Sequence, residues 1–256
     1  MADPYLTPTF LAVLVISAFA LPLFFLAWIR NTERLRHNRE PWFAVLRSFS
    51  GGAVLSVIIA ILFSLVLLNI FQRVEPLYQV LSRFANPETI VAVLIVAPFV
   101  EEAAKGLGVR SGRAYTEDRV DGLVYGAAAG LGFSATENLF YGLAVISEVG
   151  ASGSLVLIAV RSFSSSFLHA SATAVLGYGL ATSWLGHRAV LAVPFYLVAV
   201  LMHGTFNFLA SLGEIYAPVY GDWSSLLGFG AAAVFAIVAI TVVRLKLAGP
   251  RANVAG

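Results

Sequence analysis

The stretch that decides the fold is Glu101-Glu102-Ala103-Ala104-Lys105, which lies inside the apolar run from Pro87 to Leu107. An ionisable side chain in the middle of a membrane span costs at least about 2.5–3.5 kcal/mol on insertion scales. Two adjacent carboxylates and a lysine are therefore expected to face a cavity within the protein, where they find partners, and to mark a functional site.

The composition places the chain among polytopic membrane proteins. Hydrophobic residues make up 59% of the sequence and charged residues 12%, whereas soluble domains carry about 25% charged residues. The mean hydropathy is +0.86. There are no cysteines, which excludes disulfides and thiolate metal sites. The net charge of +2 does not indicate a nucleic-acid partner, because the basic residues lie between apolar runs and report orientation in the lipid bilayer.

Seven apolar runs of about 20 residues predict seven membrane spans, since this is the length that a helix needs to cross a bilayer. They cover residues 6–28, 49–71, 87–107, 121–146, 154–185, 189–212 and 225–247. The fifth run is long enough to tilt or to include an interfacial turn. No linker interrupts the chain, so we expect one all-α transmembrane helix bundle, a single domain over residues 1–256.

Lysine and arginine are concentrated on one side of these spans, which predicts the orientation. That side carries Arg30, Arg34, Arg36, Arg39, Arg47, Arg110, Arg113, Arg119, Arg188, Arg244, Lys246 and Arg251. The opposite side has only Arg73 and Arg83, and Arg161 lies inside the fifth run. We therefore expect the N-terminus outside and the C-terminus in the cytoplasm.

Polar side chains on four spans are predicted to converge on one buried cavity. At about 1.5 Å per residue they lie at similar depths, with the deepest roughly 20 Å below the outer ends of their spans. They are Glu101, Glu137, Asn138, His169, His203 and Asn207. Residues four apart share a helix face, which adds Lys105 to Glu101 and Tyr141 to Glu137.

A glycine ladder in the fourth span predicts close helix packing. Gly122, Gly126 and Gly130 are spaced four residues apart. Small residues at this spacing allow two helix backbones to approach each other. We expect this ladder to serve packing rather than chemistry.

The polar side chains suit two mechanisms of peptide-bond hydrolysis. In the first, Zn²⁺ is held with an open position and lowers the pKa of bound water toward about 7, and a second carboxylate takes the proton. The candidate ligands are Glu101, His169, His203 and Asn207. In the second, a glutamate activates water directly, while His and Asn side chains donate hydrogen bonds to the oxyanion. The residue types leave both mechanisms open.

Four motifs along the chain resemble those of PrsW-type intramembrane proteases, which are related to type II CAAX prenyl endopeptidases and Abi proteins. They are Glu101-Glu102-x-x-Lys105, Glu137-Asn138-x-x-Tyr141, His169 and His203-x-x-x-Asn207. The resemblance covers about residues 87–212, which we take as the catalytic core. The first motif alone is common, but the ordered set on membrane spans is specific.

The resemblance implies an intramembrane endopeptidase in a prokaryotic cell membrane. It also implies substrates that are membrane-anchored proteins, such as single-span anti-sigma factors. By position, it marks as catalytic Glu101, Glu102, His169, His203 and Asn207. We expect support for the site from Lys105, Glu137, Asn138 and Tyr141.

Two alternatives arise from the same sequence. Gly150-Ala151-Ser152-Gly153 matches the nucleophile motif of rhomboid serine proteases, but rhomboids place their HxxxN motif before it, whereas His203 and Asn207 follow it here. We expect Ser152 in an outer loop. Buried Glu, Lys and His residues also form proton relays in transporters and channels, although the chain has no inverted repeat of transporter type.

Overall fold

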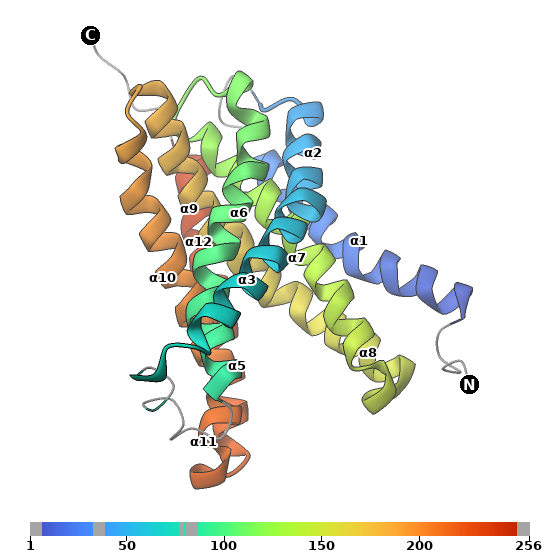
Figure 1. The fold of residues 1–256 in the computed structure, drawn as a ribbon. Coiled ribbons are helices and arrows are strands. Elements are labelled where there is room, and N and C mark those ends of the chain that lie inside the picture. Colours follow the sequence, from blue (N-terminus) through green and yellow to red (C-terminus); the bar gives the residue numbers. More distant parts are fainter. Residues whose placement is uncertain (1–6, 33–38, 77–78, 80–86, 250–256) are drawn as a thin grey trace.

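The protein is an all-α bundle throughout the part that the computed structural model describes, which is residues 7–32, 39–76, 79 and 87–249 (Figure 1). Four basic residues used to predict the orientation lie outside the described residues. They are Arg34, Arg36, Arg83 and Arg251.

Each of the seven predicted spans corresponds to a helical stretch, and the bounds differ from the predicted ones by up to eight residues. The first helices are α1 (Pro8–Thr32), α2 (Trp42–Ser50) and α3 (Val57–Phe71), with the π-helical turn Gly51–Ser56 joining α2 to α3. Next come α5 (Pro87–Val91), the π-helical turn Ala92–Val96, α6 (Ala97–Val109) and the 3-10 turn Arg110–Tyr115. They are followed by α7 (Asp121–Ala144), α8 (Ile146–Phe163) and α9 (Ser165–Leu185). The last are the 3-10 turn Ala189–Ala192, α10 (Val193–Ala210), α11 (Leu212–Tyr220) and α12 (Trp223–Ala248).

Five stretches among the described residues are long and apolar enough to cross a membrane. They are Pro8–Thr32, Trp42–Phe71, Ile146–Leu185, Ala189–Ala210 and Trp223–Ala248. The two remaining predicted spans, residues 87–109 and α7, are helical as expected but contain charged or small residues where a lipid-facing helix has large apolar ones. These two helices carry most of the predicted site.

The centre of the bundle is α7, which is buried continuously over residues 121–135. Its most extensive contact is with α9. A Cβ atom added at Gly126 or Gly130 would lie closer than 3.0 Å to the backbone carbonyls of Thr173 and His169 on α9. On another face, a Cβ at Gly132 would meet the carbonyl of Phe49 on α2 equally closely. The prediction that the glycine ladder serves close packing is confirmed.

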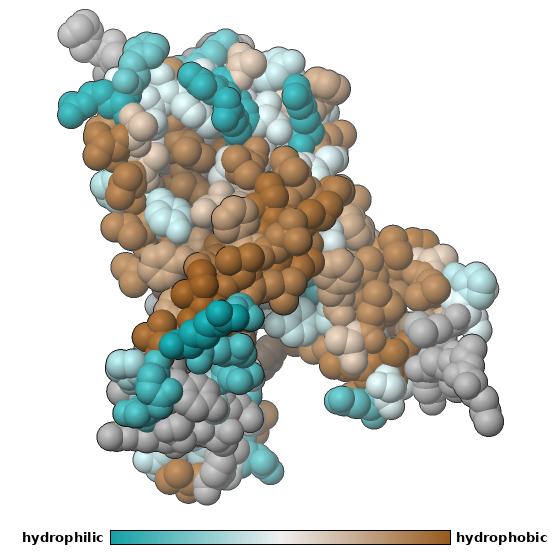
Figure 2. All heavy atoms as spheres, in the orientation of Figure 1, coloured by the Kyte–Doolittle hydropathy of each residue, from teal (hydrophilic) through white to brown (hydrophobic). Residues whose placement is uncertain are grey.

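The bundle has two different ends. At one end, which we call the basic end, α12 is joined to α1 by a hydrogen bond from Arg244 Nε to Thr32 Oγ1. Hydrophilic residues gather at this end and a broad apolar belt follows it (Figure 2). At the opposite end the helices separate into two arms (Figure 1), and Figure 2 shows a hollow between them. One arm contains the start of α1, the end of α7 and α8, and the other contains α5 and α11.

The prediction of an outer loop at Ser152 is wrong, because this residue lies in α8. The chain turns at Gly150, whose φ of 70° is in the left-handed region that a residue without a Cβ atom adopts easily. Helical geometry resumes at the next residue, so the turn is shorter than the Gly and Ser content suggested. Ser152 is exposed on this helix.

Candidate functional site

Six ionisable side chains from four helices meet inside the bundle. Their helices are brought together by the packing of α7 on α9 and of α6 and α10 on α9. The six residues are Glu101, Glu102 and Lys105 on α6, Glu137 on α7, His169 on α9 and His203 on α10. We call them the Glu–Lys–His cluster. Of the residues predicted to converge, Glu101, Glu137, His169 and His203 do so, whereas Asn138 and Asn207 have other partners.

Lys105 lies at the centre of this cluster and is fully buried. Its ammonium group donates to Glu101 Oε2 at 3.2 Å and to Glu102 Oε1 at 2.9 Å. The third contact is with His169 Nδ1 at 2.7 Å. An ammonium has three donors and no acceptor, so Nδ1 accepts. All three protons of Lys105 are therefore used within the cluster.

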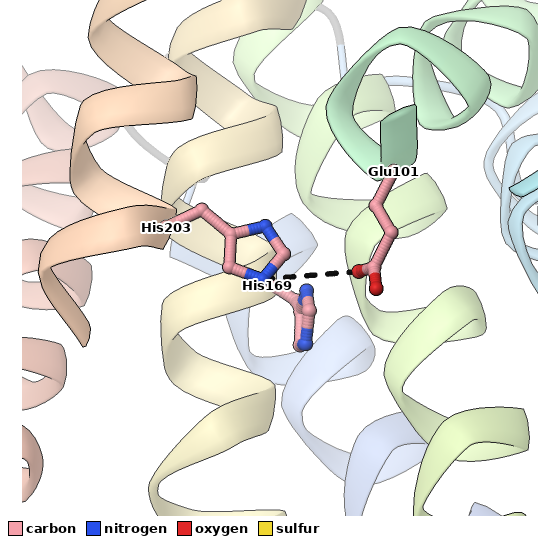
Figure 3. A group of neighbouring side chains, drawn as sticks. All are labelled: Glu101, His169 and His203. Carbon is pink, nitrogen blue, oxygen red and sulfur yellow. Dashed lines mark ion pairs between the residues drawn. The ribbon is translucent and has the colours of Figure 1, made fainter. Parts of the chain in front are cut away.

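The two imidazoles are each oriented by a carboxylate. His203 Nδ1 lies 3.0 Å from Glu102 Oε1, and His169 Nε2 lies 3.0 Å from Glu137 Oε2. Because an ionised carboxylate only accepts hydrogen bonds, the ring nitrogen that faces it carries the proton. This leaves the lone pair of His203 on Nε2, which lies 3.8 Å from Glu101 Oε2 (Figure 3).

The two adjacent glutamates have different surroundings. Both oxygens of Glu102 have hydrogen-bond partners, because Oε1 accepts from Lys105 and Oε2 accepts from Thr173 Oγ1 at 2.9 Å. The side chain of Glu102 is fully buried. The side chain of Glu101 is 14% exposed. Glu101 lines a cavity of about 250 Å³ between α3, α6 and α7, together with Glu137, Phe133 and Phe140. Glu101 is thus the member of the pair that a molecule in this cavity can reach.

Glu101, His169 and His203 fit a metal ion by their chemistry and spacing. One ligand atom from each lies within 4.8 Å of the other two, and three protein ligands with an open position are typical of catalytic zinc sites. Carboxylates behind both imidazoles, Glu102 and Glu137, are the partners that metal-binding histidines usually have. Coordination through His169 Nδ1 would require Lys105 to release its hydrogen bond to that atom.

Sequence reasoning missed the role of Arg161 on α8. Its Nη2 atom donates to Glu137 Oε2 at 2.9 Å, and its Nε atom donates to Asn138 Oδ1 at 2.9 Å. The guanidinium also lies over the ring of Tyr141, 3.6 Å from the centroid. The position of Arg161 inside a predicted membrane span could have indicated this role, because a charged side chain within the membrane needs a partner of opposite charge or a hydrogen-bond acceptor. Glu137, Asn138 and Tyr141 are therefore linked to one another through Arg161.

Two further predicted site residues have other partners. Asn138 donates to the hydroxyl of Ser166 at 3.3 Å, within a group of buried serines. Asn207 lies one turn beyond His203, but its Nδ2 atom donates to the carbonyl of Val93 at 2.8 Å. Val93 belongs to a π-helical turn, where the wider backbone pairing changes which carbonyls are available. The amide of Asn207 is thus directed to the backbone that precedes α6.

Comparisons with known proteins agree with this geometry. Residues 40–244 match the sequence profile of a family described as PrsW family intramembrane metalloprotease. Protease PrsW of Clostridioides difficile (strain 630) is 28% identical over 211 residues, which cover 75% of this chain and 76% of that protein. No solved structure matches the chain significantly. The matched range contains every residue of the Glu–Lys–His cluster.

Proposed function

The chain belongs to the PrsW family of intramembrane metalloproteases, and from this premise we propose that Glu101, His169 and His203 hold a zinc ion at which peptide bonds are cleaved. The observation that carries the proposal is the convergence of one carboxylate and two imidazoles from three helices, with ligand atoms within 4.8 Å of one another. Membership in this family favours hydrolysis over the transporter, channel and rhomboid-like alternatives.

The other cluster residues have positioning roles in this proposal. A zinc ion supplies a water of lowered pKa and polarises the peptide carbonyl. Glu102 fixes the His203 ring through Nδ1, and Glu137 fixes the His169 ring through Nε2. Glu101 and Glu137 are the carboxylates that line the cavity between α3, α6 and α7. A substrate backbone in that cavity meets these two carboxylates first.

The metal-free mechanism makes a different demand on Asn207. It needs the Asn207 amide to donate to an oxyanion beside His203. One of the two Nδ2–H donors of Asn207 is held by Val93 O and the other stays available, so this contact fits both mechanisms, and the zinc proposal rests on the two imidazoles and the carboxylate. In our proposal Asn207 anchors the π-helical turn before α6 and takes no part in metal binding.

We also propose seven membrane crossings, with the basic end in the cytoplasm. Residues 87–109 and α7 add two crossings to the five apolar stretches, because they run beside those stretches within the same bundle. The described residues at the basic end include Arg47, Arg110 and Arg188, as the excess of positive charge on cytoplasmic loops requires. A cytoplasm-dependent reporter fused after Gly256 should be active, and an active periplasmic reporter there would contradict this orientation.

The proposed substrates are membrane-anchored proteins, such as single-span anti-sigma factors. The cavity that contains Glu101 is bounded by α3, most of whose apolar side chains are not buried, so a substrate in the lipid would approach Glu101 from this side. A single substrate helix that unwinds there would present its backbone to the site. The proposal for this substrate class rests on this access and on the family.

The test combines metal content with cleavage. The purified protein should contain about one zinc per chain, and a chelator should remove both the zinc and the cleavage of a single-span reporter substrate. Glu101→Gln and His203→Ala should each lower both zinc content and cleavage, with cleavage falling at least about 100-fold. Glu88→Gln, at an exposed position on α5, is the matched control and should change neither.

Full cleavage by protein from which all metal has been removed would overturn the zinc site. Reduced cleavage with unchanged zinc content in both variants would place the metal elsewhere. Restoration of activity by added Zn²⁺ after chelation would support the proposal further.

A further inference from the structure

A second, larger cavity lies at the basic end of the bundle, away from the carboxylates of the reaction site. Its volume is about 750 Å³, within the roughly 300–1,000 Å³ of small-molecule sites. It is enclosed by the end of α6, the end of α9 and the start of α10. Its lining is separate from that of the cavity that contains Glu101.

The rim of this cavity is basic. Arg110, Arg113 and Arg188 line it together with His187, and the lining contains no acidic side chain. Among the described residues, these arginines form no ion pair, and the contact of Arg113 is with the ring of Trp184, 5.9 Å from the centroid. Three exposed arginines therefore line one cavity that has no carboxylate in its lining, which favours an anion there.

Most of the remaining lining is apolar. It includes Leu107, Leu176, Leu180, Ala192 and Trp184, with the hydroxyl-bearing Ser183 and Tyr196 beside them. A cavity lined by both arginines and aliphatic side chains matches a ligand that has an anionic part and a hydrocarbon part. A free phosphate ion would leave the apolar part unfilled.

The loop at the rim has an unusual backbone. His187 has a φ of 53° and is the one non-glycine residue with positive φ in the described chain. Such conformations are uncommon outside glycine and are concentrated at ligand-binding and functional sites. Both His187 and Arg188 line the cavity.

We propose that this cavity binds an anionic phospholipid, with its phosphate among Arg110, Arg113 and Arg188 and part of an acyl chain along Leu176 and Leu180. The cavity lies at the ends of membrane helices, where headgroups meet acyl chains, and basic pockets between such helices bind lipid phosphates. Its lining includes Gly106, the residue of α6 that follows Lys105. The bound lipid and the Glu–Lys–His cluster therefore contact the same helix, α6.

Trp184 provides a direct readout that does not depend on activity. The full chain is reconstituted in phosphatidylcholine vesicles that contain increasing fractions of brominated phosphatidylglycerol or brominated phosphatidylcholine, because bromine quenches tryptophan fluorescence on contact. The Trp184→Phe variant gives the contribution of the other tryptophans. We expect brominated phosphatidylglycerol to reach half-maximal quenching of Trp184 at a mole fraction at least about fivefold lower than brominated phosphatidylcholine.

Two triple variants test the role of charge. Arg110→Gln, Arg113→Gln and Arg188→Gln together should abolish the preference for phosphatidylglycerol. Arg47→Gln, Arg119→Gln and Lys246→Gln remove as many charges from exposed positions at the same end, outside the cavity. This control should keep the preference, and unchanged melting temperatures of both variants in detergent would show that the bundle is folded.

Four outcomes would overturn the proposal. Equal quenching by the two lipids in the unmodified protein would mean that the cavity does not select an anion. An equal loss of preference in both triple variants would assign the effect to general surface charge. Loss of quenching on addition of soluble glycerol 3-phosphate would assign the cavity to a soluble phosphate ester, and the same result with an acidic peptide would assign it to a protein segment.

Discussion

Helices α3 and α7 form two walls of the cavity that contains Glu101, and they differ in composition and burial. The residues of α3 are mostly large and apolar, but only Val57 and Ala60 are buried. Helix α7 is rich in Gly and Ala, but residues 121–135 are all buried. A leucine side chain is as stable among lipid tails as in a protein interior, so large apolar residues do not draw a helix into the bundle. Small residues do, because they allow close contact between helix backbones, and they place α7 at the centre of the bundle. The tightly packed wall holds α9, which carries His169, and contributes Glu137 to the site.

The largest effect is expected where this packing is closest. A valine at Gly130 would meet the carbonyl of His169, which belongs to a helix backbone and cannot rotate away. Gly130→Val should lower the free energy of unfolding by about 3 kcal/mol or prevent folding, as measured by thermal denaturation in detergent. Gly230→Val on α12, where nothing lies within 4 Å, should change it by less than about 0.5 kcal/mol. Equal melting temperatures for the two variants would show that α7 is not the tightly packed wall.

A smaller effect is expected from Arg161, which supports the site from outside the cluster. Arg161→Gln should lower kcat/KM by about 10–100-fold while the fold is kept, because removal of an outer partner loosens Glu137 and through it His169. Arg161→Lys should restore part of the rate. Ser152→Ala on the same helix is the control and should remain within a few-fold of the unmodified protein. If Arg161→Gln cleaves as fast as Ser152→Ala, the arginine has no positioning role.

Much of the fold and part of the site could be predicted from the sequence. The apolar runs predict the helices well because lipid requires about 20 apolar residues in succession. The rise per residue predicted that Glu101 and His169 lie at one depth, and Lys105 joins them in the structure. The catalytic roles of these residues stay a prediction.

Other features depended on three-dimensional packing that spacing does not encode. Nothing in the spacing pairs Arg161 with Glu137, because this contact depends on how α8 packs against α7. Asn207 shares a helix face with His203, but its amide is drawn to Val93 by a π-helical turn that has no simple sequence signature. The difference between Glu101 and Glu102 is likewise a matter of which side of α6 the cavity occupies.

The central claim is that side chains from four helices form one reaction centre, and the rates of a double variant test it most directly. Single-turnover cleavage of a single-span reporter substrate is measured for Glu102→Gln, for His203→Ala and for both together. Because the Glu102 carboxylate acts through His203 Nδ1, we predict that the double variant is hardly slower than the slower single variant. A loss equal to the product of the two single losses would show that the residues act independently, and it would contradict the shared site.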